Sequence, residues 1–297
     1  MQEIKGIIVP ILTPMNEDES INLPELRNQI ERMIAAGVHG IFPFGTNGEG
    51  YILSESEKEA VLEVCVDQVK GRVPVYAGSG CISTRDTIRQ SLRAKELGAD
   101  VLSIITPSFA AASQDELYTH YRTIAEAVDL PILLYNIPAR TGNALSPDTV
   151  TKLARIDNIV GVKDSSGNFD NILQYIEYTR GMDFVVLSGN DSLILWTLLA
   201  GGQGGIAGCA NVFPHNMVSI YENFVTGNIA AARQAQDAIR PFRNTFRFGN
   251  PNTVVKAATA MLGYPVGKCR APFNSLSVAG ESALKQALEQ LTAKGVC

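Results

Sequence analysis

The sequence contains no apolar run long enough to cross a membrane and no cluster of basic residues. A membrane-spanning helix needs about 20 mostly apolar residues, and charged or polar residues interrupt every stretch of that length. The net charge of −5 argues against a nucleic-acid partner. The opening MQEIKGIIVP lacks the charged segment and long apolar core of a signal peptide. We therefore expect a cytoplasmic protein with neither a membrane nor a nucleic acid among its partners.

Cysteine and histidine are scarce and scattered. The five cysteines form no CxxC pair and are odd in number, which indicates reduced thiols rather than a disulfide framework or a zinc site. None of the three histidines has the spacing of a metal or acid–base motif, so we expect structural roles for them and no bound metal. These residues are Cys65, Cys81, Cys209, Cys269, Cys297, His39, His120 and His215.

Short apolar runs alternate with helical patterns over the first 211 residues. The runs are continuous rather than alternating, which is typical of parallel strands buried on both faces. They predict eight strands, at 6–14, 39–45, 73–80, 100–107, 131–138, 159–166, 183–190 and 204–211. Helix starts between them are marked by residues suited to the N-cap, namely Asn22, Ser54, Ser83, Ser113 and Ser146.

Eight strand–helix units of about 30 residues each predict an α/β fold, the TIM (β/α)8 barrel. A doubly wound sheet is the alternative, but no GxGxxG motif follows the first strand. After residue 211 the pattern is helical only, with helices predicted at 213–226, 228–246, 251–262 and 276–294. We expect a catalytic TIM barrel over residues 1–212 and a C-terminal helical appendage over residues 213–297, packed on the barrel.

A lysine stands at the end of the sixth predicted strand, in the stretch IVGVKDSSGN. Active sites of TIM barrels lie at the C-terminal ends of the strands, so Lys163 is expected at the barrel mouth. Burial disfavours an ammonium ion, and a neutral amine can attack a carbonyl to form a Schiff base. The structural alternative is a lysine that reaches solvent or pairs with Asp164 or Glu49.

Two further strand ends and their loops carry residues suited to such chemistry. Tyr135 ends the fifth strand and could move protons for a Schiff base, or it could simply pack and bond a backbone carbonyl. The loop GTNGEG (45–50) has glycines that allow its amides to approach a small carboxylate, and Thr46 adds a hydroxyl. Arg140 could bind a second carboxylate bidentately. The alternative for the loop is an ordinary turn, and the alternative for Arg140 is a surface ion pair.

Together GTNGEG, YNIPARTG and GVKDSSGN resemble the dihydrodipicolinate synthase / N-acetylneuraminate lyase family, and the resemblance covers nearly the whole chain. It implies a TIM barrel, a homotetramer, and pyruvate or another 2-oxo acid bound to lysine, with no metal or organic cofactor. By this resemblance Lys163 is the Schiff-base lysine and Tyr135 the general acid/base. Thr46 links the tyrosine to the substrate, and the Thr46–Asn47 amides hold its carboxylate.

The family resemblance indicates the type of reaction more clearly than it indicates the substrate. Arg140 resembles the synthase branch, where this arginine holds the carboxylate of aspartate semialdehyde, and Gly189 and Ile206 match positions near the synthase pocket. Two residues depart from that branch. Asn47 replaces the second threonine of GTTGE, and Phe109 in TPSF replaces the second tyrosine of TPYY. That tyrosine crosses a dimer interface to complete a proton relay, so Phe109 is a candidate subunit contact without a hydroxyl.

We therefore expect a Schiff-base lyase or synthase that joins or cleaves pyruvate and an aldehyde. A dihydrodipicolinate-synthase-like reaction of pyruvate with aspartate semialdehyde ranks first because of Arg140. An aldolase for a 2-keto-3-deoxy sugar acid, or one like N-acetylneuraminate lyase, ranks second because of Phe109 and Asn47. A 2-oxo sugar acid dehydratase ranks third. A non-catalytic barrel that binds a small molecule is the alternative from another class.

Overall fold

The chain forms a TIM barrel in which parallel strands alternate with helices, as predicted. The computed structural model describes residues 3–296. Within them eight strands follow the order β2-β1-β8-β7-β6-β5-β4-β3, and each lies inside the apolar run that predicted it. The strands are β1 (Gly6–Val9), β2 (Gly40–Ile41), β3 (Tyr76–Gly78), β4 (Val101–Ile105), β5 (Ile132–Asn136), β6 (Ile159–Asp164), β7 (Val185–Ser188) and β8 (Gly204–Ile206).

Five of the helical segments that alternate with these strands begin at capping residues predicted from the sequence. Ser54 and Ser113 each form a reciprocal capping box with an acid three residues on, and Asn22, Ser83 and Ser146 each accept one backbone N–H. The helices are α1 (Leu23–Ala35), α2 (Glu55–Val69), α3 (Thr84–Glu96), α4 (Gln114–Ala127), α5 (Pro138–Thr141), α6 (Pro147–Leu153), α7 (Phe169–Tyr178), η1 (Asp191–Leu193) and α8 (Ile194–Leu199).

The chain after β8 is helical, as predicted, but one predicted helix is divided. The expected helix over 228–246 is interrupted at Ile239, because Pro241 has no N–H to donate to the carbonyl of Asp237. The segments are η2 (Gly208–Asn211), α9 (Pro214–Val225), α10 (Ile229–Ala238), α11 (Arg240–Arg243), η3 (Asn244–Phe248), α12 (Pro251–Met261) and α13 (Val278–Ala293).

The chain divides into two compact units. Unit 1 contains residues 74–206 and the segment up to Gly6, and unit 2 contains residues 7–73 together with the chain from Ala207 onward. The predicted division into a barrel over 1–212 and a helical region over 213–297 stays a prediction.

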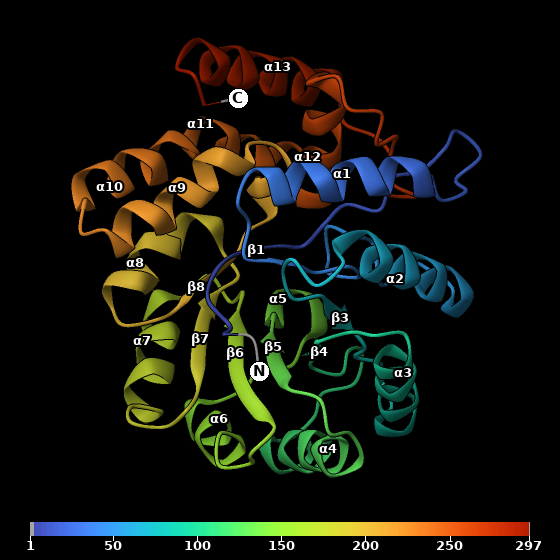
Figure 1. Cartoon of the computed structure of the whole chain (residues 1–297), viewed down its shortest axis with the longest axis vertical. Coiled ribbons are helices and arrows are strands. Elements are labelled where there is room, and N and C mark those ends of the chain that lie inside the picture. Colours follow the sequence, from blue (N-terminus) through green and yellow to red (C-terminus); the bar gives the residue numbers. More distant parts are fainter. Residues whose placement is uncertain (1–2, 297) are drawn as a thin grey trace. The chain divides into compact units, whose positions relative to one another are not determined.

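Unit 1 holds strands β3 to β8, which pair in chain order and in parallel. Helices α3, α4, α6 and α7 lie on the outer side of these strands (Figure 1). Leu133, Val162 and Leu187 are completely buried, as expected for strands covered on both faces. This packing fixes the C-terminal ends of the strands, where the predicted site residues lie.

Unit 2 holds β1 and β2, which pair through Ile8 with Gly40 and Val9 with Ile41. In its helical part Phe242 meets both Phe213 and Phe246 edge to face. The loop 45–50 follows β2 and belongs to this unit.

None of the described helices is both long and apolar enough to span a membrane. Within the described residues, the four cysteines that the structure places are not in disulfides, and Cys297 lies outside that part of the chain. Burial raises the pKa of the Cys65 and Cys269 thiols to about 12, which keeps both thiols protonated and unreactive. His39 has the structural contact expected of it, because its Nδ1 accepts the backbone N–H of Ile7.

Candidate active site

Tyr135 and Lys163 are paired neighbours at the ends of β5 and β6 in unit 1. The register places Tyr135 beside Lys163 and Asn136 beside Asp164. Because successive side chains of a strand point to opposite faces, Tyr135 and Lys163 share one face. Lys163 Nζ lies 3.8 Å from the centroid of the Tyr135 ring. The amine and the aromatic ring are therefore in direct contact.

Both side chains are buried. Lys163 and Tyr135 are each 4% exposed, so the alternative in which this lysine reaches solvent is wrong. The other alternative partners are also engaged elsewhere, since Glu49 is paired with Lys256 and the Asp164 carboxylate accepts hydrogen bonds from neutral groups. The burial of Lys163 is compatible with the covalent chemistry predicted for it, which stays a prediction.

The opposite face of the same two strands carries a hydrogen-bonded anchor. Asp164 is fully buried. Its Oδ1 accepts from Asn136 Nδ2 at 2.7 Å and from Asn171 Nδ2 at 2.9 Å, and its Oδ2 accepts from Ser166 Oγ at 2.6 Å. Burial raises the pKa of the Asp164 carboxyl, and these three donors oppose that rise. The anchor locks the end of β6 to that of β5, which fixes the position of Lys163 one residue earlier.

Gly189 makes room for the lysine side chain. Its N–H donates to the Asp164 carbonyl at 2.6 Å. A Cβ at this position would lie 2.9 Å from Lys163 Cε and would collide with Ser165 Oγ. The absence of a side chain at position 189 therefore allows Lys163 to extend past the start of the loop after β7.

Two other predicted binding residues of unit 1 also follow strand ends. Ile206 is the last residue of β8 and is 1% exposed. Arg140 lies on α5, the short helix directly after β5, and is exposed. Arg140 therefore lies on the surface five residues after Tyr135, whereas the side chain of Ile206 can offer only apolar contact.

The loop after β4 presents Phe109 to solvent. Phe109 is 98% exposed and has a φ of +79°, which is unusual for a residue with a Cβ. Asn143 holds this loop, because its Nδ2 donates to the carbonyls of Pro107 and Ala110 and its Oδ1 accepts the N–H of Ala112, each at 2.8 Å. The aromatic ring is therefore displayed by a fixed loop.

In unit 2, Thr46 and Asn47 lie in the loop 45–50 and are partly exposed. Gly48 follows them, and its carbonyl accepts from Thr13 Oγ1 at 2.7 Å. A Cβ on Gly48 would lie 2.8 Å from the Ile11 carbonyl oxygen, so only glycine allows this close approach. The loop is held tightly on one side, while Thr46 and Asn47 remain accessible to a ligand.

Sequence reasoning missed the residues that support the site. Asp164, Asn136 and Asn143 make hydrogen bonds that hold the strand ends and loops. In the sequence, the only indication of this role is that each of these polar residues adjoins a predicted site residue or lies close to one. Glu49 and Lys256 form a buried ion pair across 207 positions of the chain, and no local pattern indicates that pairing.

Comparisons with a family model, with protein sequences and with solved structures all find relatives of one family. The model of the family described as "Dihydrodipicolinate synthetase family" matches residues 3–291. A 4-hydroxy-tetrahydrodipicolinate synthase of Methanopyrus kandleri is 41% identical over 292 residues, which is 97% of each chain. A dihydrodipicolinate synthase from Acinetobacter baumannii, solved with pyruvate, is 34% identical, has a TM-score of 0.94, and aligns over 99% of this chain and 100% of its own.

A third relative has a different name. YagE from E. coli, a prophage protein of the dihydrodipicolinic acid synthase family solved in complex with pyruvate, is 32% identical with a TM-score of 0.94 and 99% of both chains covered. Both solved relatives were determined in complex with pyruvate.

Proposed function

Because this chain belongs to the dihydrodipicolinate synthetase family, a family of Schiff-base lyases, we propose that it condenses pyruvate with aspartate semialdehyde. This is the reaction of a 4-hydroxy-tetrahydrodipicolinate synthase, the name of the relative from Methanopyrus kandleri. The observation that carries the proposal is the buried amine of Lys163 lying 3.8 Å from the centroid of the Tyr135 ring.

In the first half of the reaction, the Lys163 amine attacks C2 of pyruvate. The carbonyl oxygen takes one proton from the amine and a second from the proton carrier and leaves as water, and a protonated imine remains on the lysine. Loss of a proton from the methyl carbon then gives an enamine, because the imine nitrogen accepts the electron pair. Tyr135 is the group in contact with the amine, so its phenol is proposed to carry these protons.

In the second half, the enamine carbon attacks the aldehyde carbon and forms the new carbon–carbon bond. The aldehyde oxygen takes a proton and becomes the hydroxyl of the product. The amino group of the aldehyde substrate then attacks the imine carbon, closes the ring and releases Lys163 as the neutral amine. Each step uses only groups of the two substrates, the lysine and a proton carrier.

The other residues are proposed to bind rather than to react. By the family resemblance, the Thr46 hydroxyl is proposed to link Tyr135 to the substrate. The backbone amides of Thr46 and Asn47 are proposed to bind the carboxylate of pyruvate. Arg140 is proposed to hold the carboxylate of the aldehyde, which its exposure on α5 supports. Gly189 gives Lys163 space, and Ile206 supplies an apolar wall.

The proposal is tested by mixing the protein with pyruvate and aspartate semialdehyde and following both substrates and the cyclic product by NMR. The expected result is equal consumption of the two substrates, which Lys163→Arg abolishes. Lys152→Arg is the matched control, because Lys152 is an exposed lysine on α6. If aspartate semialdehyde is not consumed while pyruvate still forms an adduct, the chemistry stands and the substrate is wrong.

A second candidate is an aldolase for a 2-keto-3-deoxy sugar acid, and Phe109 is the observation that favours it. The residue carries no hydroxyl, and its ring is 98% exposed, so it cannot relay a proton as the family tyrosine does. A panel of sugar-derived aldehydes, offered with pyruvate, separates this candidate from the synthase. Loss of water from a 2-oxo sugar acid in the same assay would indicate the dehydratase instead.

The assembly and location are also proposals. We infer a homotetramer in the cytoplasm from the family resemblance, with Phe109 at a contact between subunits. The fixed, exposed ring of Phe109 supports such a contact. Sedimentation analysis is expected to give a tetramer for the wild type and smaller species for Phe109→Ser.

A further inference from the structure

A buried carboxylate stands within the loop 45–50 of unit 2. The side chains of Glu49 and Lys256 are 0% and 1% exposed, and Lys256 Nζ lies 2.7 Å from Glu49 Oε1. The second oxygen, Oε2, accepts the backbone N–H of Arg270 at 2.8 Å. Each oxygen of the carboxylate therefore has a defined donor, one from α12 and one from the segment between α12 and α13.

The backbone around Glu49 needs such support. Glu49 has a φ of +56°, a left-handed conformation that residues other than glycine avoid and keep only where their surroundings enforce it. Its N–H donates to the Thr46 carbonyl at 3.2 Å, and its carbonyl accepts from Ile52 N. The conformation of Glu49 therefore sets the turn that contains Thr46.

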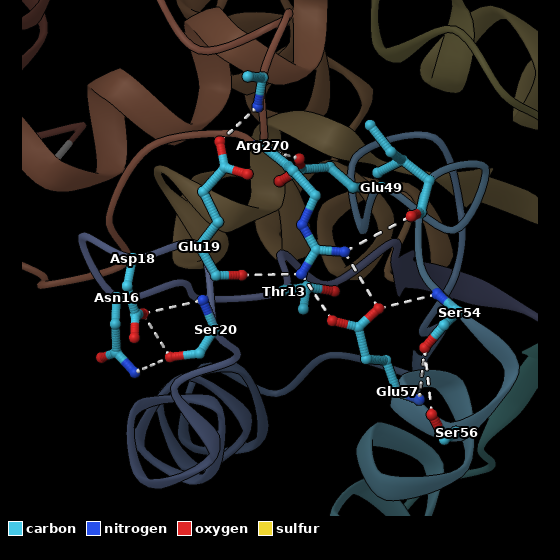
Figure 2. A network of polar contacts seen from close by, with 12 residues as sticks. Thr13, Asn16, Asp18, Glu19, Ser20, Glu49, Ser54, Ser56, Glu57 and Arg270 are labelled. Atoms are coloured by element: carbon cyan, nitrogen blue, oxygen red, sulfur yellow. Dashed lines mark hydrogen bonds and ion pairs between the residues drawn. The ribbon is translucent and has the colours of Figure 1, made fainter.

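The donor on the other side is itself held in place. The Arg270 guanidinium donates to both oxygens of Glu57, at 2.6 and 3.0 Å, and to the Glu19 carbonyl at 2.7 Å. The next residue, Ala271, donates its N–H to Glu19 Oε1. Figure 2 shows Arg270 at the centre of this network, with Glu49, Glu57 and Glu19 around it. The backbone N–H that faces Glu49 therefore cannot shift without breaking several charge-assisted bonds.

Stability alone is a weak reason for such a pair. Removing two charges from water costs about as much as their attraction returns, and apolar residues of similar size often serve as well. A buried ion pair can instead specify one local arrangement, because each charge has only one place where it is neutralised. Glu49 is completely buried, so it acts through the backbone of its loop and not by touching a ligand.

We propose that Glu49 and Lys256 are positioning residues, which hold the turn at Thr46 and Asn47 in the conformation that binds a 2-oxo acid carboxylate. This inference rests on the proposed function, in which those two residues bind the carboxylate of pyruvate. Arg270 completes the support by fixing the second oxygen of Glu49.

The test measures how much pyruvate is needed for half-maximal reductive trapping of the protein by borohydride. Glu49→Gln and Lys256→Met each leave one buried charge without its partner, so both are expected to lower the thermal unfolding midpoint and to raise the half-saturating concentration about ten- to hundredfold. The double variant E49Q/K256M removes both charges. It is expected to recover the unfolding midpoint while the half-saturating concentration stays raised.

Recovery of both quantities in the double variant would overturn the inference, because a purely stabilising pair predicts that they return together. If the single and double variants do not fold, Glu49→Asp is measured. It keeps the charge for Lys256 but shortens the side chain, so it is expected to fold and to need more pyruvate. An unchanged requirement in Glu49→Asp would also overturn the inference.

Glu31→Gln is the matched control. Glu31 lies in the same unit and makes a comparable pair with Arg72, but that pair is on the surface. The pyruvate requirement of this variant is expected to equal that of the wild type, and a comparable rise there would overturn the specific role of Glu49. A wild-type protein that forms no adduct at any pyruvate concentration would instead contradict the proposed function, so the two failures are distinguishable.

Discussion

Lys163 and Tyr135 are paired residues on adjacent strands, and the lysine amine lies 3.8 Å from the centroid of the tyrosine ring. The contact brings the proposed nucleophile against the ring of the proposed proton carrier without a loop between them. The next residue on each strand supports the contact, because Asn136 Nδ2 donates to Asp164 Oδ1 at 2.7 Å.

Tyr135→Phe is expected to reduce turnover by about two orders of magnitude or more, on the scale of general acid–base catalysis. The substitution keeps the ring against Lys163 and removes only the hydroxyl, so a loss of turnover reports on that hydroxyl. Steady-state kinetics of pyruvate condensation measures the effect. A variant as fast as the wild type would remove Tyr135 from the proton transfers.

Gly189→Ala is expected to slow adduct formation on Lys163, because the new methyl group would collide with Ser165 Oγ and lie 2.9 Å from Lys163 Cε. Overpacking of this kind costs about 1–3 kcal/mol. The rate of trapping at saturating pyruvate is the measurement. Gly181→Ala is the control, since a Cβ there meets nothing within 4 Å although its φ is +82°. Equal trapping rates in the two variants would show that the space at Gly189 does not control the reactivity of Lys163.

Arg140→Ala is expected to raise the KM for aspartate semialdehyde ten- to hundredfold, which is the range for a hydrogen bond to a charged group. Trapping with pyruvate alone should not change, because Arg140 is assigned to the second substrate. Arg155→Ala, at another exposed arginine of unit 1, is expected to leave both quantities unchanged. A rise in the pyruvate requirement of Arg140→Ala would place this arginine on the first substrate instead.

Acidification is expected to destabilise unit 1 through His120. Burial lowers the pKa of this imidazole from 6.5 to about 4, and its Nδ1 lies 2.9 Å from Thr84 Oγ1. Between these pH values the unfolded chain binds a proton here and the folded chain does not, so the free energy of unfolding falls as the pH falls from 6.5 towards 4. The loss is at most about 3.4 kcal/mol, at 1.36 kcal/mol per unit over about 2.5 units.

Denaturant titrations at several pH values measure this dependence. His120→Gln is expected to flatten the curve between pH 6.5 and 4, whereas His215→Gln, at an exposed histidine, is expected to leave it unchanged. The same slope in wild type and His120→Gln would assign the acid sensitivity to other groups.

The positions of the strands and of several helix starts along the chain could be predicted from the sequence. Continuous apolar runs marked all eight described strands, and Ser54 and Ser113 marked helix starts, because burial on both faces and N-capping are local requirements. The break at Pro241 was missed although its cause is local. The helical pattern over 228–246 continued through it, and greater weight on the proline would have divided the helix.

The support of the site was beyond sequence reasoning for a different reason. Lys163 and Tyr135 were marked by their places at strand ends, since a barrel puts such residues at one mouth. The pairing of Glu49 with Lys256 joins residues 207 positions apart, and many other carboxylates could have been its partner. The bonds that Asn143 makes to the Phe109 loop likewise depend on how two loops meet, which no periodicity indicates.

The most direct measurement is borohydride trapping with pyruvate, followed by mass spectrometry of the intact protein and of its peptides. The expected result is an added mass of pyruvic acid less one oxygen atom, located on Lys163 and absent from Lys163→Arg. An adduct on another residue, or no added mass at any pyruvate concentration, would contradict covalent chemistry at Lys163.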